Sequence, residues 1–177
     1  MTSADVIRYD DLQPAPWQNC LGVTRTIRAM PAGGGWSLSI ATIEQRAEFS
    51  LIPEAQRVQL AIDAVRLEID GREVVLGPGE QARFAGTQHV VGASVAGSSQ
   101  VLNLMYSDAI PALDVAVVRD ARELPLDSVA VVVLDGELIC GPLVLARFDT
   151  VVLEGSVRPS ISGVRGLFAV VRAAARN

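Results

Sequence analysis

A partial repeat of one β-like stretch constrains the fold of this chain more than any other sequence feature. The stretch Asp70 to Phe84 reads DGREVVLGPGEQARF, and DGELICGPLVLARF follows about 65 residues later at Asp135 to Phe148. In each copy an Asp-Gly pair follows an apolar run, which is the strongest short signal for a β-hairpin because both turn residues tolerate positive φ. Five of eight positions match from Gly-Pro to Ala-Arg-Phe. The sequence therefore predicts two similar β units.

The first hairpin has a definite expected register. A two-residue turn that starts at Asp70 pairs Leu67 with Val74 and Val65 with Leu76. Four apolar side chains then share one face of the hairpin, as cross-strand pairing requires.

The rest of the chain predicts short strands and almost no helix. No stretch sustains the helical i, i+3, i+4, i+7 pattern over three turns, and only a turn of helix is expected, around residues 119–123. The expected strands include residues 22–28, 36–41, 65–69, 82–84, 89–96, 101–106, 115–119, 129–134, 138–140, 143–148, 151–153 and 166–172. Many short, duplicated strands are typical of antiparallel sheets that form barrels or jelly rolls. We expect an all-β chain of two half-domains, residues 1–110 and 111–177.

Length and composition set the broad class of protein. A chain of 177 residues with 50% hydrophobic content buries roughly 70% of its unfolded surface, so it needs no disulfide or metal to fold. The longest apolar run, Val129 to Leu134, is far below the ~20 residues of a membrane span, and the N-terminus lacks a signal pattern. We expect a cytoplasmic protein with no membrane partner. Cys20 and Cys140 show no CxxC spacing and are expected to be reduced and structural.

The charged residues exclude several kinds of chemistry. The net charge is −5, and all 15 positive charges are arginines, which argues against a nucleic-acid partner and excludes Schiff-base or phosphate-loop lysines. The single histidine, His89, excludes metal sites built from several imidazoles. Carboxylate-only binding of Ca²⁺ or Mg²⁺ stays open, although no spaced acidic loop supports it. We therefore expect no metal site and no cofactor.

One polar constellation stands out as a candidate binding site. It provides a flat apolar ring, amides and two guanidinium groups suited to carboxylates, and consists of Trp17, Asn19, Thr24, Arg25, Arg57 and Asn103. Arg57 opens an apolar strand, so it either points into the mouth of the first barrel and binds an acid or forms a surface ion pair. Asn103 is either a structural amide or a ligand contact, and Trp17 with Asn19 is either a packed loop or part of the site.

Catalysis is the competing hypothesis, and it rests on His89. Histidine is the side chain best suited to proton transfer near neutral pH. The surrounding residues, Thr87-Gln88-His89-Val90, carry no nucleophile elbow, and no serine or cysteine has a motif that pairs it with an imidazole. No catalytic residue is therefore assigned, and His89 is kept as the alternative.

Several motifs together resemble a known family. They are Trp17-x-Asn19, Gly22-x-Thr24-Arg25, Trp36-x-x-Ser39-Ile40-Ala41, Phe49-Ser50-x-x-Pro53-x-x-x-Arg57 and Leu102-Asn103-Leu104-Met105. The chain resembles the HutD/Ves family over about Tyr9 to Val171. The resemblance implies a bicupin-like fold and a bacterial protein encoded with histidine-utilisation enzymes. It also implies a regulatory or small-molecule-binding role, with formylglutamate as a candidate ligand.

The chain departs from the family pattern at several positions. Cys20-Leu21-Gly22 replaces a glycine-rich run, and Thr26 stands at the position of a glutamate. Val101 replaces an acidic residue and Ser107 a basic one. These changes remove charge where a polar ligand would sit, so a different ligand, or none, is implied.

Three functions follow as alternatives. The first is a non-catalytic protein of amino-acid catabolism that binds or responds to a small carboxylate-bearing metabolite. The second is a metal-free isomerase or lyase that uses His89. The third is an assembly protein without a ligand. The mean hydropathy of +0.34 and the apolar second half also predict a homodimer.

Overall fold

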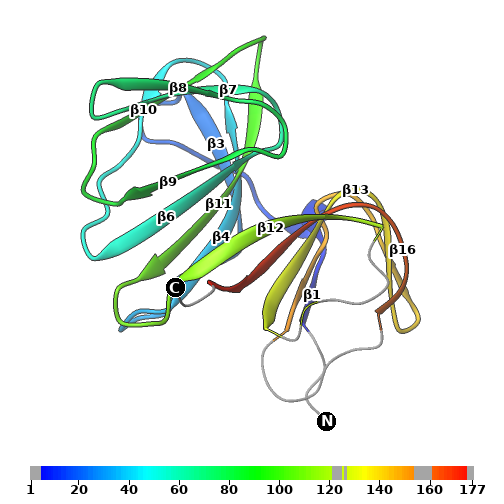
Figure 1. Cartoon of the computed structure of the whole chain (residues 1–177). Helices are drawn as coiled ribbons and strands as arrows, with labels where there is room; N and C mark the ends of the chain where they lie inside the picture. The colour runs from blue at the N-terminus through cyan, green and yellow to red at the C-terminus, as the bar shows by residue number, and fades with distance from the viewer. Residues whose placement is uncertain (1–4, 121–124, 126, 154–160, 175–177) are drawn as a thin grey trace. The chain divides into compact units, whose positions relative to one another are not determined.

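The structure is a computed structural model that describes residues 5–120, 125, 127–153 and 161–174. These residues form strands β1 to β16 and one short 3₁₀ helix, η1 (Tyr9–Asp11) (Figure 1). Nowhere in these ranges is there a helix long and apolar enough to cross a membrane. The prediction of an all-β chain of antiparallel sheets is confirmed, because every strand pair described is antiparallel.

The chain divides into two compact units by its internal contacts. The N-terminal unit is Gln13–Ile110, and the C-terminal unit combines Pro111–Asn177 with Met1–Leu12. This division differs from the expected half-domains at the start of the chain. Strand β1 (Asp5–Ile7) pairs with β15 (Thr150–Val152), so the first residues described belong to the C-terminal unit.

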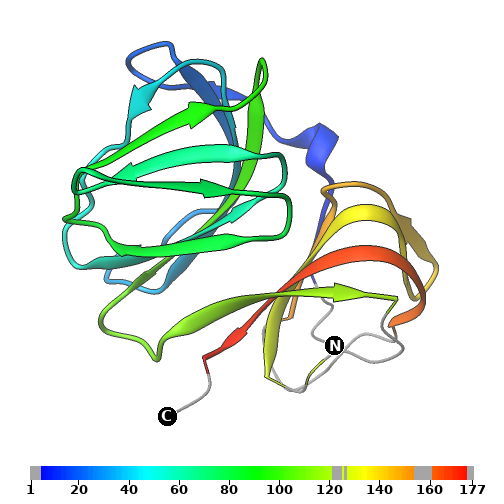
Figure 2. The ribbon, with the colours of Figure 1, turned by 45° about the horizontal axis from the view of Figure 1, so that its top comes forward.

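The N-terminal unit contains two sheets (Figure 2). The larger sheet has the order β2 (Ala15–Pro16), β3 (Gly22–Arg28), β4 (Trp36–Ile43), β11 (Ser99–Ser107), β6 (Ala55–Ala61) and β9 (Gln81–Ala85). The smaller sheet has the order β5 (Ala47–Glu48), β10 (Val90–Ser94), β7 (Val65–Ile69) and β8 (Arg72–Leu76). One apolar cluster draws on both sheets and includes Ile43, Leu67 and Val101, each fully buried.

The Asp70 hairpin has the register that the sequence predicts. Val65 lies opposite Leu76 and Leu67 opposite Val74. Val65, Leu67 and Leu76 are buried in the apolar cluster, whereas Val74 is 36% exposed. Val74 is exposed because β8 is the edge strand of its sheet.

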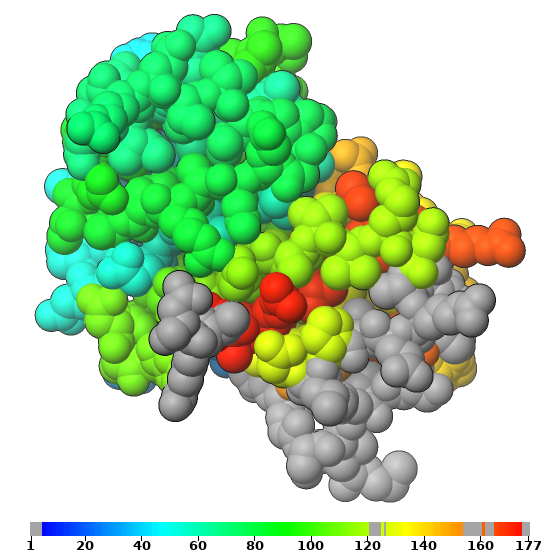
Figure 3. Space-filling view, viewed as in Figure 1, coloured from blue at the N-terminus to red at the C-terminus, as the bar shows by residue number. Residues whose placement is uncertain are grey.

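The described residues of the C-terminal unit form one sheet. Its strands have the order β1, β15, β13 (Ser128–Cys140), β16 (Ile161–Ala173) and β12 (Leu113–Arg119), and β14 (Leu143–Leu145) also pairs with β13. Residues of β12 and β16 lie side by side at the surface in the space-filling view (Figure 3). The core of this unit is apolar and includes Val131, Val133, Leu138, Val151 and Phe168.

The second predicted hairpin, at Asp135-Gly136, is wrong. Strand β13 continues through this pair with bulges on both sides, and the predicted strands 129–134 and 138–140 are parts of it. The chain reverses instead at Gly141-Pro142, between Cys140 and Leu143. Gly136 (φ +85) lies opposite Gly166, and a Cβ on Gly136 would be 2.2 Å from the Arg165 carbonyl oxygen. The glycine therefore permits close strand approach and does not form a turn.

The rest of the repeat has also diverged. Ala82 to Phe84 lie within β9, whereas Ala146 to Asp149 form a turn closed by the Asp149 N–H on the Ala146 carbonyl. Phe84 and Phe148 are both buried. Most of the expected turn at residues 119–123 lies outside the described residues.

Candidate functional site

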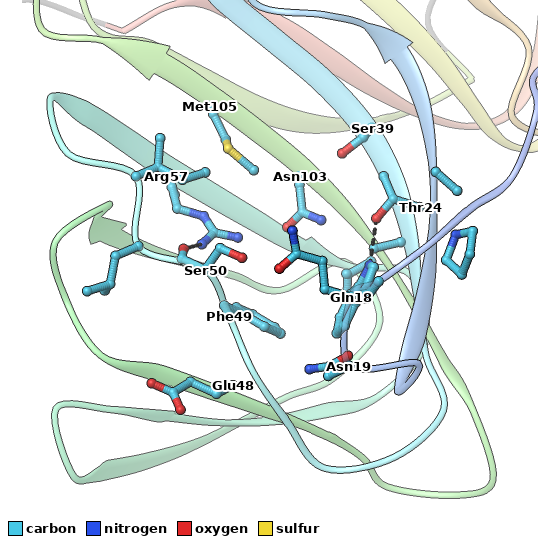
Figure 4. Close-up of a pocket in the computed structure, with 17 residues that line it drawn as sticks. Gln18, Asn19, Thr24, Ser39, Glu48, Phe49, Ser50, Arg57, Asn103 and Met105 are labelled. Atoms are coloured by element: carbon cyan, nitrogen blue, oxygen red, sulfur yellow. Dashed lines mark hydrogen bonds between the residues drawn. The ribbon is translucent and has the colours of Figure 1, made fainter.

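The N-terminal unit contains a cavity of about 670 Å³ that is partly open to solvent, which we call the Arg57 cavity. Its walls come from β3, β4, β6 and β11 and from two segments, residues 15–19 and 48–52. On these four strands the lining residues are Thr24, Ser39, Ala41, Arg57, Val101, Asn103 and Met105. Figure 4 shows the side chains of Arg57, Asn103 and Gln18 pointing towards one another across the cavity.

Arg57 is the one positively charged residue in the lining. Strand alternation places it on the inner face of β6, opposite Met105 on β11 and Phe84 on β9. Arg57 is only 8% exposed, and its guanidinium lies 5.3 Å from the Phe49 ring centre and 5.1 Å from that of Phe84. Burial lowers the pKa of Arg57 from its ordinary value to about 10. The group is therefore still charged at neutral pH, within an apolar setting.

The protein satisfies this charge poorly. Nη1 of Arg57 donates one long hydrogen bond of 3.4 Å to the Ser50 carbonyl, and Nε has no partner within the described parts of the chain. Glu48 is the acidic residue in the lining, but its Oε1 lies 2.8 Å from Nε2 of His89. Both of these side chains are more than half exposed. No carboxylate of the described residues forms an ion pair with Arg57.

The loop before β3 fixes Trp17 in the cavity wall. Nε1 of Trp17 donates to Oγ1 of Thr24 at 2.8 Å, and the indole packs edge-on against Phe49 with ring centres 5.8 Å apart. Gly22 makes this possible, because a Cβ there would be 3.0 Å from the Trp17 ring and 2.7 Å from the Thr42 carbonyl oxygen. The spacing of Trp17, Gly22 and Thr24 in the sequence thus has a packing cause.

Asn19 shapes the same loop. Its side-chain oxygen accepts a hydrogen bond from the Leu21 N–H at 3.1 Å, which is the hydrogen bond of an Asx turn. The Cys20 N–H bonds to the Trp17 carbonyl, and Cys20 adopts a φ of +56. A left-handed φ favours glycine, so the glycine-rich pattern expected here matches the backbone even though this chain carries a cysteine.

A row of buried polar side chains crosses the inner face of the larger sheet. Asn103 on β11 lies opposite Ser39 on β4 and Gln59 on β6. All three are at most 9% exposed. Neither amide atom of Gln59 has a hydrogen-bond partner among the described residues. Ser39 and Asn103 line the Arg57 cavity, and Gln59 lies next to them in the same row.

The structure brings together five of the six candidate binding residues. Trp17, Asn19, Thr24, Arg57 and Asn103 line the Arg57 cavity. Arg25 does not line it. It follows Thr24 in β3, so alternation directs its side chain to the opposite face of the strand.

His89 lies outside the lining of the Arg57 cavity. Its side chain is 54% exposed and pairs with Glu48, and its backbone N–H donates to the Asp70 carboxylate at 3.0 Å. Both cysteines are free, with Cys20 exposed and Cys140 buried. Burial raises the pKa of the Cys140 thiol. No group of three or more metal-ligating side chains occurs in the described ranges.

The amino-acid sequence matches the model of a known protein family. The model described as HutD matches residues 9–166, which is most of the chain. The chain belongs to the HutD family. A curated relative from Pseudomonas putida, an uncharacterized 21.2 kDa protein in the hutC 3′ region, is 32% identical over 114 residues. That alignment covers 60% of this HutD-family chain and 60% of the relative, so the chain spans less than two thirds of the relative's length.

Two solved structures have folds similar to this one over nearly the whole chain. HutD from Pseudomonas fluorescens SBW25, solved in a formate condition, is 25% identical with a TM-score of 0.83, covering 99% of this chain and all of that one. A conserved protein of unknown function from Pseudomonas aeruginosa PAO1 is 23% identical with a TM-score of 0.71, covering 98% of this chain and 93% of that one. The bicupin-like fold expected from the resemblance is thereby confirmed.

The departures from the HutD pattern fall in different places. Val101 lines the Arg57 cavity and is fully buried, so an apolar surface stands where an acid is expected. Ser107 lies outside this cavity and accepts a hydrogen bond from the Gly35 N–H at 3.0 Å. Thr26 is exposed. Of these three changes, only Val101 alters the wall of the Arg57 cavity.

The sequence reasoning missed Gln59, Ser39 and Phe49. A signal for Gln59 was available, because Arg57, Gln59 and Ala61 alternate with Val58 and Leu60. Period-2 alternation places Gln59 on the same strand face as Arg57.

Proposed function

We propose that this HutD-family protein binds a small carboxylate-bearing metabolite in the Arg57 cavity, as a binding or regulatory protein and not as a catalyst. The observation that carries the proposal is a buried, charged guanidinium without a carboxylate partner in the described chain. A buried charge is costly unless it is paired. A ligand carboxylate supplies the pair and two parallel hydrogen bonds to the guanidinium.

The shape of the cavity suits a small acid with an apolar body. The guanidinium lies near the rings of Phe49 and Phe84, and Trp17 and Val101 provide further apolar wall. A volume of about 670 Å³ falls within the ~300 to 1,000 Å³ of small-molecule sites. Such sites combine apolar walls with a few placed polar groups, and here Arg57, Asn103 and Ser39 are those groups.

The biological setting comes from the relatives. The Pseudomonas putida relative is encoded in the hutC 3′ region, and the Pseudomonas fluorescens HutD was solved in a formate condition. We extend the histidine-utilisation link to this chain, so the candidate ligands are acids of that pathway.

A catalytic role has less support. The single histidine lies outside the cavity lining and pairs with Glu48 at its exposed edge. Within the lining, Glu48 and Arg57 are the only residues with charged side chains. We therefore expect the bound acid to be recovered unchanged.

The test is calorimetric titration of the purified protein with formate, glutarate and N-formylglutamate. Arg57→Met keeps an unbranched side chain against the phenylalanine rings but removes the charge. Losing the buried partner of a charged pair costs ~2 to 5 kcal/mol, so affinity should fall by at least about 30-fold. Arg57→Lys should retain part of the affinity, because an ammonium keeps the charge without the two-pronged geometry.

Arg66→Met is the matched control. Arg66 is exposed and pairs with Glu73 at 3.1 Å on the smaller sheet of the same unit. Its substitution should leave the affinity unchanged. Equal affinity in Arg57→Met and the parent, or conversion of any of the acids, would overturn the proposal.

A further inference from the structure

Gln59 is the most deeply buried polar side chain near the Arg57 cavity, and the proposed function does not use it. It is 0% exposed, and both its Oε1 and its Nε2 lack hydrogen-bond partners in the described chain. Buried amides are almost always hydrogen-bonded, and each exception needs an explanation. An amide left unpaired on both atoms is a candidate for a group that becomes paired when a ligand binds.

The position of Gln59 relates it to Arg57. The two residues lie on the same face of β6, two positions apart, which is about 6.6 Å along a strand. Across the sheet Gln59 lies directly opposite Asn103, whose side chain lines the cavity. Directly opposite residues have Cβ atoms about 4.5 to 5.5 Å apart. The Gln59 amide is therefore adjacent to the cavity wall, on the side of Arg57 nearer the apolar core.

No hydrogen bond within the described chain fixes the amide of Gln59. The side chain has three rotatable bonds, and neither amide atom is tied to a described residue. Turning the amide past Asn103 towards the cavity breaks no hydrogen bond within the described chain. An uncharged ligand group that both donates and accepts can satisfy both atoms, because an amide offers one acceptor oxygen and two donor hydrogens.

We propose that Gln59 is a specificity-determining residue of the Arg57 cavity, and that the ligand is an acid amide. Its carboxylate binds Arg57, and its carboxamide, a few bonds away, pairs with the amide of Gln59 beside Asn103. This inference rests on the proposed function and adds the class of ligand. A site that hydrogen-bonds a polar group rejects the analogue that lacks it, since its own buried polar atoms are then left unpaired.

The experiment uses two probe acids of matched shape. Glutaramate, the half-amide of glutarate, carries a carboxylate and a carboxamide separated by three methylenes. In 5-methylhexanoate an isopropyl group replaces the carboxamide. The ratio of their affinities is measured by calorimetry for the parent, Gln59→Met, Gln59→Asn and Gln56→Met. Each neutral hydrogen bond is worth ~0.5 to 1.5 kcal/mol, so the preference for glutaramate should fall roughly tenfold in Gln59→Met.

Gln59→Asn keeps the amide but shortens the side chain by one methylene, so it too should lose the preference. This second variant tests the inference even if Gln59→Met fails to fold. Gln56→Met is the control on the same strand. Gln56 lies on the opposite face of β6, and its amide donates to Asp108 at 3.0 Å. The glutaramate preference should be unchanged in this variant.

The outcomes separate this inference from the proposed function. Arg57-dependent binding of both acids with the same affinity ratio in the parent and both Gln59 variants overturns the role of Gln59 and leaves the carboxylate site intact. An equal fall in Gln56→Met also overturns it, because the effect is then not specific to the inner face. Failure of both acids to bind, while formate, glutarate or N-formylglutamate binds through Arg57, overturns this inference alone. Binding that does not depend on Arg57 overturns the proposed function and this inference together.

Discussion

In the C-terminal unit, the buried polar side chains of Ser128, Asp149 and Thr150 each have a hydrogen-bond partner. In the N-terminal unit, by contrast, Nε of Arg57 and both amide atoms of Gln59 are buried without a hydrogen-bond partner in the described chain. Both units are antiparallel β structures with apolar clusters. They differ in whether buried polar groups are satisfied by the protein itself.

This difference assigns different roles to the two interiors. A satisfied buried carboxylate such as Asp149 joins segments far apart in sequence and contributes to stability. An unsatisfied guanidinium or amide costs stability unless something else binds it. The C-terminal unit thus uses its polar groups as structural links, and the N-terminal unit keeps some of them available beside a cavity.

The largest expected effect is the loss of a structural link in Asp149→Ala. The Asp149 carboxylate accepts hydrogen bonds from Arg8 at 2.7 Å and from the backbone N–H groups of Tyr9 and Ala146 at 2.9 and 3.0 Å. Hydrogen bonds to a charged group contribute ~1.5 to 3 kcal/mol each, and the substitution removes three of them, although Arg8 keeps its other hydrogen bond, to the Val144 carbonyl. We expect the free energy of unfolding to fall by about 4 kcal/mol, and by less in Asp149→Asn, which keeps one acceptor oxygen.

Urea unfolding is followed by two signals, so that unfolding of the N-terminal unit can be distinguished from unfolding of the whole chain. Both tryptophans, Trp17 and Trp36, lie in the N-terminal unit, so their fluorescence reports that unit, whereas circular dichroism reports the whole chain. A fall of less than about 1 kcal/mol, the net worth of one ordinary hydrogen bond, would show that Asp149 is not a structural link.

The two Asp-Gly pairs, one in each unit, allow a second comparison of the units, with a smaller expected change in the free energy of unfolding. Gly71 (φ +78) and Gly136 (φ +85) have similar φ angles, but a Cβ on Gly71 would meet nothing within 4 Å. Gly71→Ala should therefore cost only the ~1 to 2 kcal/mol of a left-handed non-glycine residue. In Gly136→Ala the Cβ would lie 2.2 Å from a backbone oxygen, so we expect a cost of about 3 kcal/mol, measured by the same urea unfolding. Equal costs would show that the strands at Gly136 can separate freely.

This pair of glycines also shows how far the sequence predicts the fold. The register at Asp70 follows from local alternation, because Val65, Leu67 and Leu76 all need the same buried face. At Asp135 the same dipeptide lies within a strand whose partner, β16, begins more than 20 residues later. A contact this distant in sequence outweighs turn propensity, and the single sequence carries no signal for it.

The candidate site was predictable to a similar degree. Arg57 and Asn103 follow from alternation together with the family resemblance, and both line the cavity. Arg25 was included because it stands in the same motif as Thr24, although alternation directs the two side chains to opposite faces. Gln59 is absent from the predicted site, and its lack of a partner is visible only in three dimensions.

The smallest expected effect is a gain in stability, in contrast to the losses above. It tests directly whether the N-terminal unit keeps an unsatisfied polar group. Burial lowers the pKa of Arg57 to about 10, which corresponds to roughly 3 kcal/mol against the charged form at neutral pH. The contacts with Phe49 and Phe84 and the long bond to Ser50 return roughly half of this. Arg57→Met should therefore raise the stability of the ligand-free protein by about 1 to 2 kcal/mol, measured by tryptophan fluorescence in urea.

Saturating glutaramate should remove this advantage, because it stabilises only the protein that binds it. A loss of stability in Arg57→Met without ligand, comparable to that of Asp149→Ala, would mean that the guanidinium is already held as a structural link. The contrast between the two interiors would then no longer explain where the ligand binds.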